Sequence, residues 1–273
     1  MADNKYAKSR NRLINIIDLK LADISQILLP LIVIVTLGIL WEVWINIADL
    51  PSYLLPPPSE IFSRLFGDLW FFVRHGLVTL VEAICGLVVG SAIAISLAIL
   101  MRYWKILERT LFPIALLIKV TPIIAVAPLF VIWFGFGSGP KILIVALITF
   151  FPVMVNTLVG LKSVNMDSLD FLKTLNASEW EIMIHLRIPS ALPYLFAALR
   201  ISLPLSIIGA VVGEWFTGDR GLGSVIIVAH NNIDMPTLFS SVFSLAFIGV
   251  SLNIMLVFCE RKILFWHDSN LRV

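Results

Sequence analysis

The chain has 273 residues, a mean hydropathy of +0.97 and charged side chains at only 14% of its positions. A soluble domain carries about 25% charged residues, so this composition excludes an ordinary soluble protein, and the net charge of +2 is too small to indicate a nucleic-acid partner. The two cysteines, Cys85 and Cys259, both lie in apolar stretches, which indicates neither a disulfide framework nor a metal site.

The apolar stretches are long and do not alternate, which favours helices over the strands of a membrane barrel. We therefore predict an all-α integral membrane protein with one transmembrane domain, residues 26–266, between cytoplasmic tails at 1–25 and 267–273. The first apolar stretch is expected to remain as an anchor, because polar residues precede it and no small-residue cleavage site follows. The six predicted spans are 26–48, 77–101, 110–135, 142–161, 193–213 and 237–259.

The predicted loops after the first and fifth spans carry local structure. Residues 51–76 place Ser59 as a helix N-cap, followed by an amphipathic helix with one apolar side: Ile61, Phe62, Leu65, Leu69 and Phe72. Residues 217–236 contain three glycines that permit a tight re-entry before a short apolar stretch: Gly218, Gly221 and Gly223.

The third span is the least regular of the six. It contains Pro113, Pro122 and Pro128 and ends in the sequence WFGFGSGPK. Proline removes a backbone donor and clashes with the preceding turn, so we predict a kinked or broken span whose freed carbonyls are satisfied by neighbouring helices or water.

The distribution of Lys and Arg outside the spans predicts the orientation. Fourteen lie in the two termini and the second and fourth loops, including Arg102, Lys105, Arg109, Lys162, Lys173 and Arg187. The opposite side has four: Arg64, Arg74, Lys141 and Arg220. The positive-inside rule then places both termini and the loop 162–192 in the cytoplasm.

Four charged residues within or beside the spans are candidates for a functional role, because burial of a charge near the bilayer centre costs about 2.5 to 3.5 kcal/mol. Lys119 is predicted roughly 14 Å from the inner end of its span, close to the bilayer midplane. Glu82 and Glu214 are predicted towards the outer side, and Arg200 in the inner half of the fifth span. These residues either line a translocation path, with Lys119 attracting an anion, or have structural roles, such as Lys119 pairing with a carboxylate and Arg200 snorkelling to the interface.

The loop 162–192 is predicted to contain two short helices at an angle on the cytoplasmic surface. MDSLDFLKT forms the first helix, Asn176 takes the left-handed conformation that ends it, and Ser178 with Glu181 forms a capping box for the second. The second helix is expected to break at Pro189, after which Ser190 caps the fifth span. The exposed apolar face would comprise Leu175, Ala177, Trp180 and Met183, and either a protein partner or lipid could cover it.

No catalytic pattern accompanies these features. The four histidines, at positions 75, 185, 230 and 267, are widely spaced, and no HExxH, GxSxG or GxxxxGK[ST] motif occurs. We therefore expect no catalytic site in this chain.

The stretch DFLKTLNASEWEIMIHLRIPSALP resembles the cytoplasmic loop signature of permease subunits of ATP-binding-cassette (ABC) importers. In this signature Asp170, Phe171 and Leu172 stand where the family has Glu-Ala-Ala, and Asn176 stands where it has Gly. Three further stretches are similar to the nitrate, sulfonate, taurine and pyrimidine-precursor branch: VTPIIAVAPLFVIWFGFGSGPKI, SALPYLFAALRISLPLSIIGAVVGEWFTGDRGLG and DMPTLFSSVFSLAFIGVSLN. The resemblance covers residues 50 to 266.

The resemblance implies a multi-pass subunit of the bacterial cytoplasmic (inner) membrane that works with a second copy of the permease. Its other partners would be membrane lipid, an external (periplasmic) substrate-binding protein and two cytoplasmic ATPase subunits, which would bind ATP and Mg, so that this chain itself holds no cofactor. Residues 170–189 would then seat in the ATPase as a coupling helix. The coupling residues would be Asp170, Leu175, Asn176, Ala177, Ser178, Trp180, Glu181 and Pro189.

Three other functions remain compatible with parts of the sequence. An ATP-independent secondary transporter or channel would show paired broken helices or intramembrane carboxylates for a proton relay, and here one proline-rich span has no matching partner. A membrane-embedded enzyme would need clustered catalytic groups, and a purely structural subunit would leave the charges in the spans unexplained. The expected solute is small and anionic or heterocyclic.

Overall fold

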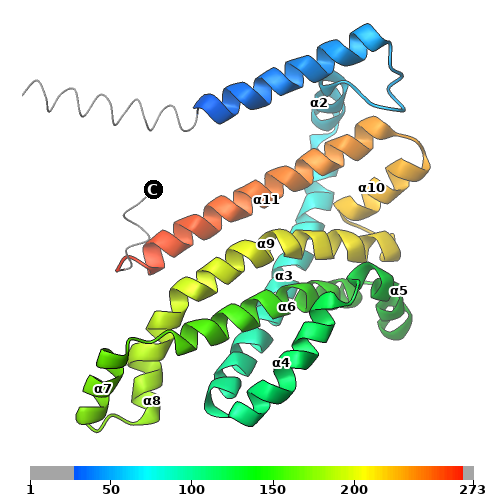
Figure 1. Ribbon diagram of the computed structural model, residues 1–273. Helices are drawn as coiled ribbons and strands as arrows, with labels where there is room; N and C mark the ends of the chain where they lie inside the picture. The colour runs from blue at the N-terminus through cyan, green and yellow to red at the C-terminus, as the bar shows by residue number, and fades with distance from the viewer. Residues whose placement is uncertain (1–27, 267–273) are drawn as a thin grey trace, which may run out of the picture. The chain divides into compact units, whose positions relative to one another are not determined.

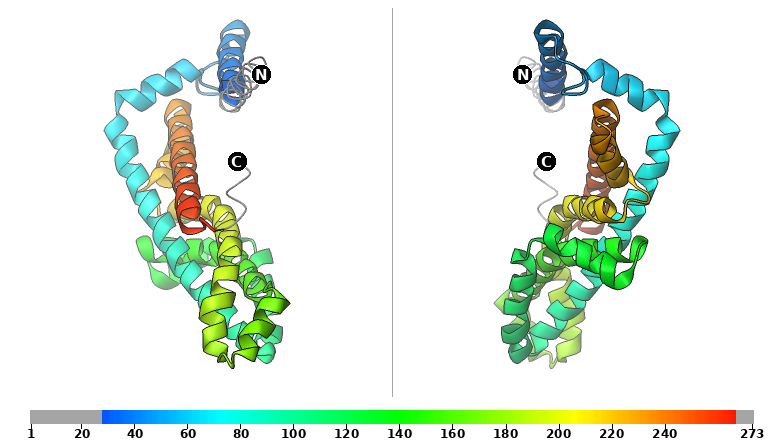
Figure 2. Two further views of the ribbon diagram at one scale, coloured as in Figure 1. Left: turned by 90° about the vertical axis from the view of Figure 1, so that its left-hand side faces the viewer. Right: turned by 90° about the vertical axis from the view of Figure 1, so that its right-hand side faces the viewer.

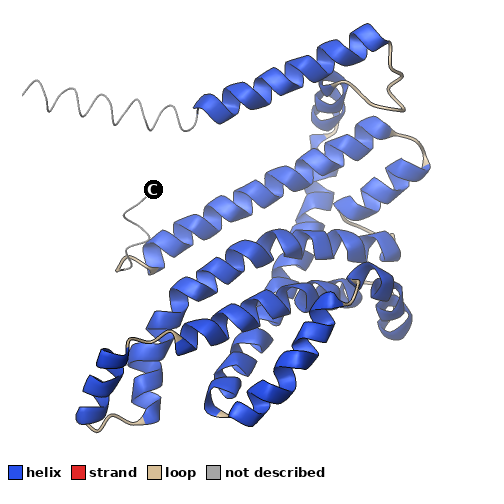
Figure 3. Ribbon diagram, in the orientation of Figure 1, coloured by secondary structure: helices blue, strands red, loops and turns tan. Residues whose placement is uncertain are grey.

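The computed structural model describes residues 28–266, and the predicted tails 1–25 and 267–273 lie outside this range. Every regular element within it is a helix, as Figure 3 shows, which confirms the all-α prediction. In the described part of the chain five helices are long and apolar enough to cross a membrane, and a sixth span results if the bent pair α4 and α5 is counted as one. The described chain forms two compact units that divide between Ser63 and Arg64.

The first unit contains the helix Leu28–Ala48 and the start of α2, Pro58–Gly67. Ser59 was predicted as the N-cap of this helix, but α2 begins one residue earlier. The Ser59 hydroxyl and backbone N–H instead donate to the Glu42 carboxylate, at 2.7 and 3.0 Å. A proline at the first helical position explains the earlier start, since its missing N–H would be unsatisfied there in any case.

In the second unit, three long helices pack most closely: α3 (Leu69–Tyr103), α6 (Ser138–Lys162) and α9 (Ile188–Thr217) (Figures 1 and 2). Small residues allow the close approach, as expected for helices that pack in lipid. A Cβ added at Gly90 would lie 2.6 Å from the Ala146 carbonyl oxygen, and one added at Gly160 would lie 2.8 Å from the Ala191 Cα. These helices form the core that positions both ends of the unit.

The predicted irregular span is broken. The helices α4 (Lys105–Val120) and α5 (Ile123–Phe134) meet at a bend of 98°. Pro122 restricts Thr121 to an extended conformation, with ψ of 125°, so the helix ends there. Pro113 and Pro128 lie inside the two helices without ending them.

The remaining elements lie at opposite ends of the α6 and α9 pair (Figure 1). At one end, α7 (Met166–Thr174), α8 (Glu179–Ile182) and a π-helical turn (Met183–Arg187) connect α6 to α9. At the other end, α10 (Leu222–Asn231) connects α9 to α11 (Met235–Ile263). The helix of the second predicted span, α3, begins at Leu69 rather than at residue 77. Asp68 caps this helix by accepting a hydrogen bond from the Phe71 N–H.

Candidate functional site

A group of polar side chains, which we call the polar cluster, lies where α10 begins: the buried Thr79, Glu82, Lys141 and Glu214 and the half-exposed Asp219. Lys141 of α6 is only 1% exposed. Its ammonium nitrogen lies 3.0 Å from the Glu82 carboxylate of α3 and 2.8 Å from the carboxylate of Asp219. Because a buried ammonium must be paired, these contacts join α3, α6 and the loop that follows α9.

Glu214 lies at the centre of the cluster and is fully buried. Its carboxylate accepts a hydrogen bond from the Thr79 hydroxyl at 2.7 Å and another from the backbone N–H of Gly223. Thr79 also accepts from the Leu222 N–H at 2.9 Å. The first N–H groups of α10 have no partners within their own helix, so side chains from α3 and α9 satisfy them and complement the positive end of the helix dipole.

Glycine makes room for this carboxylate. Gly221 has φ of 104°, a backbone conformation that residues other than glycine rarely adopt. A Cβ at Gly223 would lie 2.7 Å from Glu214 Oε2. The predicted glycines therefore form a tight turn that folds the chain around the Glu214 side chain, and the re-entry into the membrane stays a prediction.

Charge is not balanced within the cluster. Glu82 Oε2 is buried and has no hydrogen-bond partner in the described part of the chain. Asp219 is 45% exposed at its side chain; burial alone would raise its pKa, but the Lys141 ammonium outweighs this and holds the pKa below its usual value. Lys141 is thus the cation on which both neighbouring carboxylates depend.

Lys141 was predicted to lie in a loop outside the fourth span, and this was wrong. The helix α6 begins at Ser138, so Lys141 lies in its first turn and faces α3 and α9. The sequence does carry a signal for part of the cluster, because His75, Thr79 and Glu82 are spaced at i, i+4 and i+7 and share one face of α3. Only the tertiary structure brings Glu214 and Lys141 to that face.

Lys119 does not belong to the polar cluster. Its ammonium nitrogen lies 4.8 Å from the ring centroid of Phe151, which is near the middle of α6 and about 15 Å along that helix from Lys141. Lys119 is exposed, and within residues 28–266 no carboxylate lies within salt-bridge distance of it. The predicted alternative of a carboxylate partner is therefore replaced by a cation–π contact.

Arg200 has a structural partner. Its guanidinium nitrogens lie 2.6 and 2.8 Å from Glu260 Oε2 of α11. An ion pair thus links α9 to α11, and the snorkelling of Arg200 to the interface stays a prediction.

The helices α7 and α8 form a hairpin that confirms the local predictions for residues 166–181. Asn176 has φ of 56°, and the N–H groups of Asn176 and Ala177 bond to Lys173 and Leu172 in the pattern of a Schellman motif. Ser178 and Glu181 form the predicted capping box, with both reciprocal bonds present.

The hairpin exposes large apolar side chains. Leu175 and Trp180 are exposed at 62% and 65%, as predicted, and so is Phe171 at 63%. Ala177 is half-buried, and Met183 is 1% exposed, so its predicted exposure was wrong. Met183 packs into the core between α3 and α6 because the turn containing it faces the bundle.

The predicted break at Pro189 is also wrong. The helix runs continuously from Glu179 to Thr217, and α8 therefore continues a spanning helix instead of lying along the surface. The π-helical turn carries an extra residue, so that the Ile188 N–H reaches the Met183 carbonyl and the widened turn accommodates the proline. Ser190 does not cap a new helix, because its hydroxyl donates to the Leu186 carbonyl at 2.7 Å.

Comparison with known proteins supplies a family. Residues 86–264 match the family described as binding-protein-dependent transport system inner membrane component. The chain is 33% identical over 243 residues to the riboflavin transport system permease protein of Chloroflexus aurantiacus, covering 87% of this chain and 90% of that one. It is 36% identical over 227 residues to the formylaminopyrimidine transport permease protein of Halalkalibacterium halodurans (82% and 90% covered) and 29% identical over 247 residues to the taurine transport system permease protein of Escherichia coli (86% and 89% covered).

Proposed function

The chain belongs to the family of inner-membrane components of binding-protein-dependent transport systems, and from this membership we propose that it forms the path of an ATP-driven importer and couples to its ATPase through residues 170–189. It is an ABC transporter permease subunit, and the ATPase that binds ATP and Mg is a separate chain. Residues 26–266 form the transmembrane domain, with both termini in the cytoplasm of the bacterial cell. The pair of ATPases, the external binding protein and the second permease copy complete the assembly.

The observation that carries this proposal is the construction of the α7–α8 hairpin. Its turn is fixed by the Schellman motif at Asn176 and by the capping box at Ser178. Its second helix continues through the π-helical turn into α9 without a break. A force applied at Trp180 therefore reaches the bundle through a continuous helix, which is the requirement for a coupling element.

A protein partner explains the exposed face of the hairpin better than lipid does. The helix Glu179–Thr217 has 39 residues and is about 58 Å long at 1.5 Å per residue, whereas the hydrocarbon layer is ~30 Å thick. At least one end of this helix therefore projects beyond the hydrocarbon layer, and in the proposed topology this is the α8 end. The exposed ionisable groups here are mostly acidic, namely Asp167, Asp170, Glu179 and Glu181 against Lys173, and an anionic lipid surface would repel them.

The hairpin also offers a place for a partner side chain. A cavity of about 440 Å³ lies between α7 and the π-helical turn, lined by Asp167, Ser168, Phe171, Leu172 and Leu186. Its aromatic and aliphatic walls suit an apolar group, and the acidic residues around it suit Lys or Arg on the ATPase.

In this proposal Lys119 and the two carboxylates have different roles. Lys119 is exposed, held over Phe151 and free of a carboxylate partner within the described residues, so it is available to an anionic or heterocyclic solute in the path. Glu82 and Glu214 support the path indirectly, because they fix α10 and the loop before it against α3 and α6.

Variants of the hairpin test the coupling. Trp180→Ala removes an exposed aromatic side chain, and Glu181→Lys reverses a charge and breaks the capping box. We expect both proteins to reach the membrane, with solute uptake reduced at least about tenfold, as for loss of an interface hot spot of 2 kcal/mol or more. Uptake and ATP hydrolysis are measured together in proteoliposomes that contain the copurified ATPase.

The matched control is Trp70→Ala, because Trp70 is equally exposed, at 72%, but lies at the start of α3. This control should transport normally. Normal uptake by both hairpin variants would contradict the assignment of residues 170–189 as the coupling element. Uptake by the purified chain without any ATPase would favour a secondary transporter or channel instead.

A further inference from the structure

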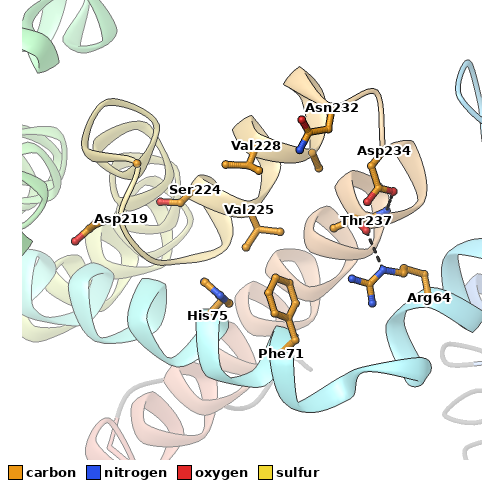
Figure 4. A pocket seen from close by; sticks show the side chains of 12 residues that line it. Arg64, Phe71, His75, Asp219, Ser224, Val225, Val228, Asn232, Asp234 and Thr237 are labelled. Atoms are coloured by element: carbon orange, nitrogen blue, oxygen red, sulfur yellow. Dashed lines mark hydrogen bonds between the residues drawn. The ribbon is translucent and has the colours of Figure 1, made fainter.

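A cavity of about 320 Å³ opens between α10 and the first turns of α3 and α11 (Figure 4). Its apolar wall consists of Phe71 from α3 and of Val225, Val228 and Ala229 from α10. The lining also includes polar groups from α2, from α3 and from the two ends of α10 with their flanking loops: Arg64, His75, Asp219, Ser224, Asn232 and Asp234. This volume is at the lower end of the range of small-molecule sites, which combine an apolar lining with a few convergent polar groups.

Arg64 is held rigidly at one end of this cavity. Its Nε–H donates to the Thr237 hydroxyl at 2.9 Å, and its guanidinium carbon lies 5.9 and 5.4 Å from the ring centroids of Phe71 and Phe72. These contacts use one of the five N–H donors of arginine. Over residues 28–266, no carboxylate lies within 4.0 Å of this guanidinium, so its remaining donors are available to an oxyanion.

The other charges of the lining limit what the cavity accepts. Asp219 is paired with Lys141, and Asp234 caps α11 by accepting from the Thr237 N–H at 3.2 Å. Both carboxylates are therefore already engaged, yet they remain close enough to oppose a ligand with two negative charges. A single anionic group at Arg64 is favoured, and the wall formed by Phe71 and α10 favours an apolar body.

We propose that this cavity is a binding site for a small organic monoanion, a carboxylate or sulfonate, whose charged group meets Arg64 and whose apolar body lies against Phe71 and α10. The planar guanidinium donates two parallel hydrogen bonds to such a group. Asp219 and the α10 backbone are shared with the polar cluster, so a bound ligand contacts the same loop that Lys141 and Glu214 hold in place.

This inference rests on the proposed function in one respect, namely that the ligand is a solute that passes through the permease. Binding itself requires no ATPase. It is therefore measured on the full-length chain alone, in nanodiscs of phosphatidylcholine, by saturation-transfer NMR. The probes are benzenesulfonate, the neutral benzamide and the doubly charged benzene-1,3-disulfonate.

We expect benzenesulfonate to bind more tightly than either of the other two probes. Arg64→Gln should weaken benzenesulfonate binding about ten- to hundredfold, the effect of losing hydrogen bonds to a charged group. Because this change also removes the bond to Thr237, a second variant, Val228→Trp, fills the cavity from a half-exposed position and leaves Arg64 intact. Val228→Trp should abolish benzenesulfonate binding, because the indole occupies the space of the ligand.

The matched control is Arg74→Gln. Arg74 lies near the start of α3, next to His75, but does not line this cavity, so the control should bind benzenesulfonate as the unaltered chain does. Binding that survives both Arg64→Gln and Val228→Trp, or benzamide binding as tight as that of benzenesulfonate, would overturn the site. If the hairpin variants uncouple uptake while benzenesulfonate fails to bind, the cavity assignment alone is wrong and the proposed function stands.

Discussion

Lys141→Met tests the physical account of the polar cluster most directly. Methionine has a similar length and no charge, so the change leaves the packing of α6 nearly intact while removing the only cation of residues 28–266 that contacts Glu82. Glu82 is 4% exposed, and its second carboxylate oxygen already lacks a partner. Removing one member of a buried ion pair leaves the other charge uncompensated and costs about 3 to 5 kcal/mol.

The structure also predicts how the cost divides between the two carboxylates. Asp219 is 45% exposed, so water replaces part of its contact with Lys141, and Asp219→Asn should cost about 1 kcal/mol or less. Glu82 has no such access to water. The double variant Lys141→Met with Glu82→Gln should therefore recover most of the stability lost in Lys141→Met, because two neutral groups of similar volume often replace a buried pair at little cost.

The assay is reversible unfolding of the full-length chain in mixed micelles, followed by circular dichroism, for Lys141→Met, Glu82→Gln, Asp219→Asn, the double variant and the unaltered protein. The double-variant cycle isolates the coupling between Lys141 and Glu82. The ion pair does not hold this end of the bundle together if Lys141→Met lowers the free energy of unfolding by less than about 1 kcal/mol. The same conclusion follows if adding Glu82→Gln to Lys141→Met recovers none of the lost stability.

Two further changes test individual residues. Lys119→Ala should reduce uptake of the transported solute in proteoliposomes. Lys119→Arg should retain most of the uptake, because this change keeps a cation over Phe151. Undiminished uptake by Lys119→Ala would show that the charge has a structural role. Asn176→Gly should leave hairpin stability and uptake unchanged, whereas Asn176→Val should destabilise the turn by about 1 kcal/mol or more, since a β-branched residue is strained at φ of 56°; equal hydrogen-exchange rates of the α7 amides in both variants would contradict this.

Local features of this protein follow closely from its sequence. The capping box at Ser178, the left-handed Asn176 and a kink or break in the proline-rich third span were all predicted, because each depends on residues within a few turns of one another. The Pro189 prediction failed for a related reason. A proline ends a helix unless the backbone widens ahead of it, and the sequence has no simple signal for the π-helical turn that does so here.

The candidate site could be predicted only in part. Glu82, Lys119 and Glu214 were identified because charge within an apolar stretch is costly and therefore informative. Their partners could not be assigned, since Lys141 and Asp219 lie 59 and more residues from Glu82 along the chain and approach it only through helix packing. Lys141 in particular stands at the edge of an apolar run, where it looks like an ordinary flanking charge.

The sequence by itself determined that this protein is helical, lies in a membrane and carries a capped hairpin between two of its spans, because hydropathy and capping act over short distances. The tertiary structure alone decided which buried charges meet, that α10 is held by Thr79 and Glu214, and that Arg64 faces an open cavity. Those outcomes depend on close contact between α3, α6 and α9, made possible by glycines whose role becomes visible only when the helices are packed together.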